Sequence, residues 1–80
     1  MLRLYATQVK KHLTSTVKGE VKFWLQDDDI IFTIYCVNSI VFQYTLQNAS
    51  NHIHNSMSSE LCAKTILKRY NSYIRNLFFK

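Results

Sequence analysis

The chain has 80 residues, of which 48% are hydrophobic, 14% aromatic and 19% charged, and this balance predicts one small globular domain with a modest core. One glycine and no proline exclude collagen-like and linker-like sequences, and they also exclude the glycine-rich loops that bind nucleotide phosphates. Ten Lys and Arg against five Asp and Glu give a net charge of +5, which favours polyanions or acidic proteins as partners without specifying one.

The first predicted element is a helix from about Leu2 to Lys18. Its apolar residues recur at spacings of three and four, at Leu2, Ala6, Val9, Leu13 and Val17. We expect Gly19 to end this helix in the left-handed conformation, which glycine adopts without a steric penalty. The period then changes to two, so residues 20–26 are predicted to form a strand.

Two more strands are predicted, over 30–37 and 40–46. The three aspartates at 27–29 indicate a tight reversal, because Asp hydrogen-bonds its own backbone in turns, and Asn38-Ser39 supplies the second turn. The strands are expected to form an antiparallel meander, with Cys36 also alternating onto its core face. The other residues predicted for this face are Val21, Phe23, Leu25, Ile30, Phe32, Ile34, Phe42 and Tyr44.

A polar loop is predicted over 47–56, followed by a final helix over about 57–78. Ser56 or Ser58 is expected to cap this helix, and Glu60 lies in its first turn, where the helix dipole favours an acid. The order helix, three strands, helix predicts an α+β fold. Residues 1–80 then form a single domain with both helices packed on one face of the sheet.

Groups that could carry chemistry are few. A metal site would require His52 and His54 to converge with other ligands such as Cys36, Cys62 or His12, and no second paired ligand motif is present. Both cysteines are interpreted as small structural hydrophobes, and the three aspartates lie adjacent on a turn without a distant partner. We therefore expect no enzyme activity, no metal and no cofactor.

Two cysteines are too few for a disulfide scaffold, and no secretory leader begins the chain, so an intracellular location is expected. This means the cytoplasm, or the host cytoplasm for a phage-encoded chain. The stretch from Ile30 to Leu46 is mostly apolar, but polar residues recur in it at strand-like spacing. It therefore predicts a hairpin, and we expect no membrane span.

Two surfaces are candidate binding sites. The C-terminal helix carries a basic stripe at steps of four, three and four, which suits phosphates or an acidic protein groove and would otherwise be a solvated helix face. Its residues are Lys64, Lys68, Asn71 and Arg75. The sheet face away from the helices is rich in apolar and aromatic residues, as contact surfaces are, unless Phe78, Phe79 or the polar loop covers it. Its residues are Lys22, Trp24, Ile31, Tyr35, Val37 and Val41.

The predicted order of elements is similar to that of double-stranded RNA-binding domains and of the two small signal-recognition-particle proteins that bind Alu RNA. The chain departs from the first family where RNA would be contacted. Asp27-Asp28-Asp29 replaces a Gly-Pro-His type reader, and Ser59-Glu60-Leu61-Cys62-Ala63-Lys64 stands where paired lysines open the last helix. Similarity to the Alu-binding pair is confined to the pattern from Phe32 to Leu46.

The size, the single sheet and the lack of catalytic motifs are also similar to small phage-encoded inhibitors such as anti-CRISPR proteins. The sequence therefore predicts a non-enzymatic interaction protein that occludes a macromolecular partner, as an inhibitor or adaptor does. The expected partner is a protein or nucleoprotein bound by the sheet face. One alternative is an RNA- or DNA-binding module that uses the basic stripe, and another is a homodimeric component of an assembly.

Overall fold

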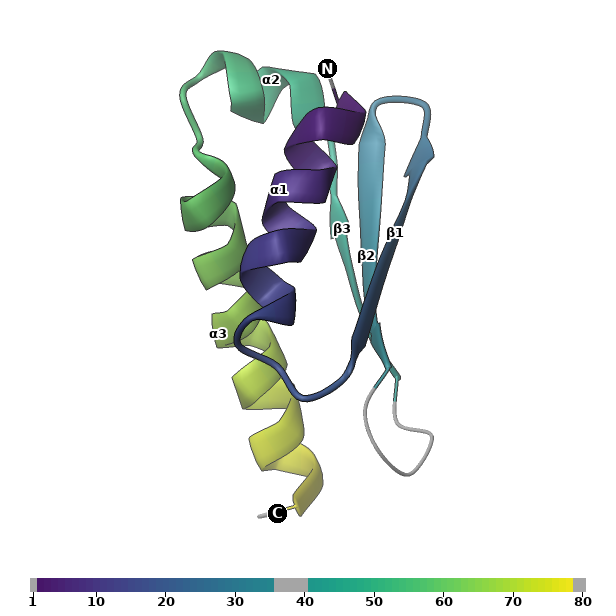
Figure 1. Ribbon diagram of the computed structural model, residues 1–80, viewed down its shortest axis with the longest axis vertical. Coiled ribbons are helices and arrows are strands. Elements are labelled where there is room, and N and C mark those ends of the chain that lie inside the picture. The colour runs from purple at the N-terminus through teal and green to yellow at the C-terminus, as the bar shows by residue number, and fades with distance from the viewer. Residues whose placement is uncertain (1, 36–40, 79–80) are drawn as a thin grey trace.

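The computed structural model describes residues 2–35 and 41–78. Its elements in chain order are α1 (Leu2–Thr14), β1 (Glu20–Gln26), β2 (Asp29–Tyr35), β3 (Val41–Leu46), α2 (Ala49–His54) and α3 (Ser59–Phe78). The strand order is β1-β2-β3 with both pairings antiparallel, and Figure 1 shows α1 and α3 on the same side of the sheet. The predicted α+β arrangement is confirmed, and the short helix α2 is added to it. The predicted turn at Asn38-Ser39 and the positions of Cys36 and Val37 lie outside the described residues.

The inner face of the sheet is the one that the alternation predicts. Phe32 lies at the centre of β2, where it pairs with Phe23 of β1 and Tyr44 of β3. Ile30 and Ile34 flank it, and all three β2 side chains are fully buried. The helices complete this core with Ala6, Val9, Leu13, Cys62, Ala63 and Ile66. The apolar side chains that alternate along the strands thus pack against the apolar stripes of the helices, and together they form one core layer.

Helix α1 ends at Thr14, earlier than the predicted end at Lys18. The hydroxyls that follow its last apolar residue donate hydrogen bonds to main-chain carbonyls of the final turn. Thr14 donates to Lys10 at 2.8 Å, and Ser15 and Thr16 donate to His12 at 2.8 and 3.2 Å. Such side-chain bonds offer the backbone an alternative to further helix, which explains the early end.

Gly19 does not have the left-handed conformation that the sequence predicts, so its expected role in ending α1 was wrong. The residue instead lies against the backbone of the neighbouring strand. A Cβ atom at this position would overlap the carbonyl oxygen of Tyr35. Glycine is therefore required here for the close approach of two main chains, not for its conformational freedom.

Helix α2 occupies most of the segment that was predicted to be a polar loop. The loop prediction was therefore wrong for residues 49–54. Its first main-chain N–H groups are satisfied by the β1–β2 turn, far away in sequence. Asn48 N–H donates to the Asp29 carboxylate at 3.1 Å, Ala49 N–H to the Asp28 carbonyl at 2.7 Å, and Ser50 N–H and its hydroxyl to the Asp28 carboxylate. The acidic turn is thus the N-terminal cap of α2, supplied by a distant segment.

Asp28→Ala is expected to lower the free energy of unfolding by about 1 to 2 kcal/mol, because the side-chain acceptor at the start of α2 is lost. Asp28→Asn keeps an acceptor oxygen and should lose less than half as much. Urea denaturation of the two variants and the parent measures this difference. Equal losses in both variants would contradict the capping role, since they would point to the charge rather than to the hydrogen bonds.

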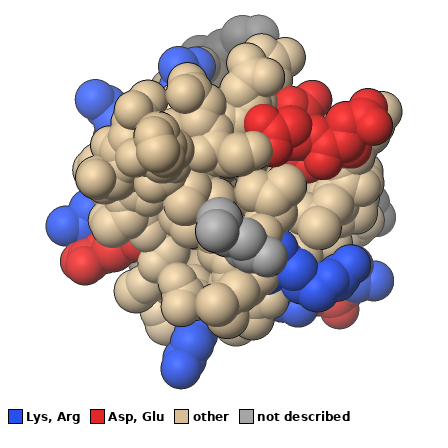
Figure 2. All heavy atoms as spheres, turned by 90° about the horizontal axis from the view of Figure 1, so that it is seen from above, with Lys and Arg blue, Asp and Glu red and all other residues tan. Residues whose placement is uncertain are grey.

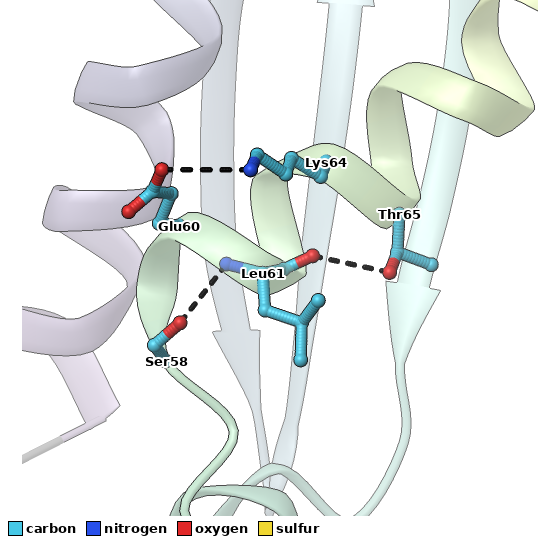
Figure 3. A network of polar contacts seen from close by, with 5 residues as sticks. All are labelled: Ser58, Glu60, Leu61, Lys64 and Thr65. Carbon is cyan, nitrogen blue, oxygen red and sulfur yellow. Dashed lines mark hydrogen bonds and ion pairs between the residues drawn. The ribbon is translucent and has the colours of Figure 1, made fainter.

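Helix α3 begins at Ser59, two residues after the predicted start, and its cap is Ser58, one of the two serines that the sequence offered for this role. The Ser58 hydroxyl accepts a hydrogen bond from Leu61 N–H at 3.1 Å (Figure 3). One turn later Glu60 and Lys64 form an ion pair of 3.6 Å, and the Thr65 hydroxyl donates to the Leu61 carbonyl. The first two turns of the longest helix are therefore stabilised by contacts among its own residues, in addition to any contact with the sheet.

Candidate interaction surfaces

The outer face of the sheet is exposed at two places. Trp24 is 44% exposed at one of them, beside its strand partner Ile31, which is only 7% exposed. Tyr35 and Val41 pair with one another at the other, and they are 40% and 45% exposed. The structure thus places four of the six predicted sheet-face residues in two apolar groups on the face opposite α1 and α3, while Val37 lies outside the described residues.

A polar row separates these two groups. Lys22 pairs with Thr33, which in turn pairs with Gln43. The ammonium of Lys22 lies 3.2 Å from the Glu20 carboxylate and 5.7 Å from the centre of the Tyr35 ring. The Thr33 hydroxyl is buried without a hydrogen-bond partner in the described part of the chain. The face therefore offers aromatic contact area with one cation already balanced by an acid, which suits a protein partner better than a phosphate backbone.

The basic stripe of α3 faces solvent, since its four predicted residues are all exposed. Among the cations of this stripe, Lys64 is partly neutralised by its ion pair with Glu60. Lys68 and Arg75 make no ion pair with any described residue. Arg69, which was not among the predicted stripe residues, is also exposed and lines a shallow groove beside β3. Arg69 lies at the margin of the apolar stripe of this helix, so the sequence pattern did not predict that its side chain would face solvent.

Cations of α1 extend the basic surface of α3 only in part. The two helices lie side by side, and His12 lines a groove together with Lys64 and Glu60. Lys11 lines an adjoining groove with Ser59. Seen from above, most acidic atoms gather in one cluster at the end that carries the β1–β2 turn, whereas Lys and Arg are spread around the rim (Figure 2). The positive charge is therefore distributed and not concentrated in one patch at this end.

The histidines and the described cysteine do not form a metal site. Residues 2–35 and 41–78 contain no group of three or more His, Cys, Asp or Glu side chains that could hold a metal ion. His52 and His54 lie on α2, and Cys62 is buried in the core, 1% exposed. Cys62 thus occupies the place of a small hydrophobe, where it is closed to solvent.

Cys62 shares its buried environment with Tyr5. The Tyr5 hydroxyl donates to the Met57 carbonyl at 3.0 Å and lies 3.3 Å from that of Ser58, where it ties α1 to the start of α3. Burial raises the pKa of the Tyr5 phenol, and the neighbouring Cys62 raises it further. Burial also raises the pKa of the Cys62 thiol. A protonated, enclosed thiol is a poor nucleophile, so this pair is a structural contact.

The raised pKa values of Tyr5 and Cys62 predict a loss of stability in alkali. Their ordinary values are 10.0 and 9.0, so above about pH 9 the unfolded chain releases these protons while the folded chain keeps them. The contribution of these two groups to the free energy of unfolding should be constant below that pH and fall above it. Tyr5→Phe should cost about 1 kcal/mol at pH 7 and flatten the fall above pH 10, whereas the exposed Tyr35→Phe should not. Denaturation at several pH values tests this, and parallel profiles for all three proteins would contradict it.

Among the described residues, no helix combines the length and the apolar character that a bilayer crossing requires. Comparison of the chain with models of protein families, with curated protein sequences and with solved structures gave no significant match.

Proposed function

We propose that this protein is a non-enzymatic binding protein that occludes a macromolecular partner through its outer sheet face, as an inhibitor or adaptor does. One observation carries the proposal. Trp24, Tyr35 and Val41 are 40–45% exposed on a face that no described helix covers. Aromatic side chains of this kind bury a large area with little loss of conformational entropy, and they are enriched among the residues that dominate binding energy.

The arrangement of the face supports a protein partner. Its two apolar groups flank a row of neutral and paired polar side chains, which resembles the alternation of anchors and hydrogen-bonding groups in protein interfaces. A nucleic acid would need several free cations on this face, and the only described one, Lys22, is paired with Glu20. The protein or nucleoprotein partner expected from the sequence is therefore the favoured one.

The test is affinity capture with four baits: the parent, Trp24→Ala, Tyr35→Ala and a matched control, Leu4→Ala. Leu4 is 65% exposed on α1, away from the sheet face, so its truncation removes a similar exposed apolar side chain. A partner of the sheet face should be retained by the control and weakened about 30-fold by loss of an aromatic anchor. A partner retained equally by all four baits would exclude the sheet face as its binding site.

A second function, nucleic-acid binding by α3, is supported by the exposed and unpaired cations Lys68, Arg69 and Arg75. Labelled single- and double-stranded RNA and DNA should then bind with strong salt dependence, and Lys68→Glu should lower the salt slope by about 1 or more. Lys18→Glu, with the same change of charge away from α3, is the control. Absence of binding at low salt would exclude this function. The homodimer alternative is tested separately, by the mass in solution of the same samples.

A further inference from the structure

A groove open to solvent lies between β3 and the C-terminal half of α3. Its volume is about 320 Å³. The last turns of α3 extend past the end of α1 (Figure 1). Aromatic rings and planar polar groups line the groove together, from Phe42, Gln43 and Tyr44 on β3 and from Arg69, Tyr73 and Asn76 on α3. The three helix positions are four and three residues apart, so they share one face of α3.

Aromatic contacts fix the shape of this groove. The Phe42 ring packs against those of Tyr70 and Tyr73, with centroids 5.6 and 5.4 Å away. The Tyr73 hydroxyl also donates a hydrogen bond to the Val41 carbonyl at 3.3 Å, which ties α3 to β3. Tyr44 is half-buried in the same groove. A groove held in this way is largely formed before a ligand arrives, so binding requires little ordering of its side chains.

The charges around the groove have one sign. Arg69 is exposed and forms no ion pair with any residue in 2–35 or 41–78. Lys68 and Arg75 lie within about 60° of Ser72, which also lines the groove, at 100° per residue. Residues 41–46 and 61–80 contain no acidic side chain. The groove therefore lies in a positive field, which favours a ligand with negative charge.

We propose that this groove binds an unpaired base of a single-stranded nucleic acid, while the cations of α3 bind its phosphates. The site rests on the second function proposed above, and it specifies the form of nucleic acid and the residues that contact the base. Aromatic rings such as Tyr44 and the planar guanidinium of Arg69 stack on bases. The amides of Gln43 and Asn76 each offer a donor beside an acceptor, which matches the edge of a base.

Other occupants use only part of this arrangement. An acidic peptide matches the charge of Arg69 but has no planar group to stack on the rings. A duplex offers phosphates, but its bases are stacked on one another, so their faces cannot enter the groove. A second copy would bring another chain of net charge +5 to a positive surface. An unpaired base attached to phosphates uses both the aromatic lining and the positive field.

The experiment compares two labelled probes by fluorescence anisotropy, at about 50 and about 200 mM salt. One is oligo(dT) of about 12 nucleotides, and the other is a GC-rich duplex with the same number of phosphates. Attraction to phosphates alone favours the duplex, because its charge density is higher. We expect oligo(dT) to bind at least about tenfold more tightly than the duplex at the higher salt concentration, where stacking contributes most.

The outcomes separate the groove from the general function of α3. Equal affinity for the two probes, or tighter binding of the duplex, would overturn base binding in the groove and leave phosphate binding by α3 intact. Binding of neither probe at the lower salt concentration would overturn both.

Two variants of Tyr44 test whether a base stacks in the groove. Tyr44→Leu keeps an apolar side chain against the core but removes the ring, and it should weaken oligo(dT) binding at least about tenfold. Tyr44→Phe keeps the ring and should stay within about twofold of the parent. Thermal melting verifies that both variants are folded. Equal affinity of the two variants for oligo(dT) would overturn stacking on Tyr44.

A matched pair of arginine variants separates the planar group from the charge. Arg69→Lys keeps the charge but loses the guanidinium plane, so it should weaken oligo(dT) binding roughly fivefold and duplex binding less than about twofold. Arg3→Lys makes the same change at an exposed position on α1 and should alter neither. Equal weakening of oligo(dT) binding by both variants would overturn the assignment of Arg69 to the site.

The side-chain amide signals of Gln43 and Asn76 report the position of the base directly. Oligo(dT) should shift both signals in nuclear magnetic resonance spectra of the whole chain. The exposed amides of Asn51 and Asn55, at the other end of the molecule beside the acidic turn, are the controls and should not shift. Oligo(dT) binding without shifts at Gln43 and Asn76 would overturn the proposed site.

Discussion

Replacing Phe32 by alanine is expected to lower the free energy of unfolding by about 3 to 5 kcal/mol. Phe32 is the largest fully buried side chain among the described residues. It lies on the central strand, with the Phe23 ring 6.3 Å away between centroids and strand partners on both sides. The surrounding backbone is held by the sheet ladder, so the site cannot collapse to fill the cavity. For a domain of this length, whose total stability is on the order of 4 to 12 kcal/mol, the loss is a large fraction.

Two control variants separate cavity formation from a general loss of aromatic area. Phe32→Leu retains most of the volume and should lose less than half as much stability. Tyr35→Ala removes an aromatic side chain from the same strand at an exposed position and should cost under about 1 kcal/mol. Urea denaturation followed by the fluorescence of Trp24, the single tryptophan, gives the three values. A loss for Tyr35→Ala as large as that for Phe32→Ala would contradict the assignment of the two sheet faces.

Gly19→Ala is expected to destabilise the fold by about 1 to 3 kcal/mol, although the change is a single methyl group. That methyl group would overlap the carbonyl oxygen of Tyr35, which is main chain and cannot rotate away. The start of β1 would have to move from β2 to relieve the overlap. Helix propensity and backbone strain play no part, because Gly19 has no positive φ.

The matched test of this steric cause uses Gly19→Ser and Lys18→Ala. Serine places the same Cβ atom against Tyr35 and should lose as much stability as alanine. Lys18 is exposed in the same connection, and its truncation should stay within about 0.5 kcal/mol of the parent. Thermal denaturation of the variants is sufficient. A Gly19→Ala variant as stable as the parent would show that β1 can shift without loss, which would contradict the steric cause.

The sheet was predictable because its signal is local. Alternation along each strand distinguishes Ile30 and Phe32 from their neighbours, and the apolar stripe of α1 shows where the complementary surface lies. The end of α1 was predicted incorrectly, because Gly19 is a common stop signal whereas the hydroxyls of 14–16 act through bonds to the preceding turn. Helix α2 was missed for another reason. Its cap comes from Asp28, which is 22 residues from Ser50, and no local pattern reveals such a partner.

For the candidate surfaces too, the local pattern predicted which residues share a face, but it did not predict their contacts. Periodicity identified Trp24 and Tyr35 as residues of the outer face, since side-chain direction follows from the strand. It did not show that Ile31 is shielded by its neighbours, nor that Lys22 is paired with Glu20, because both depend on packing across the sheet.

The contact between Tyr5 and Met57 also bears on how the chain folds during synthesis. It joins residues 52 positions apart, and it belongs to the layer in which the first helix packs against the last. A ribosome releases α1 long before α3, so α1 has no partner for one flank until nearly all of the domain has emerged. We therefore expect the core to close late in synthesis. Pulling-force or protease-protection assays on arrested nascent chains should detect a compact state only after the first turns of α3 have left the exit tunnel.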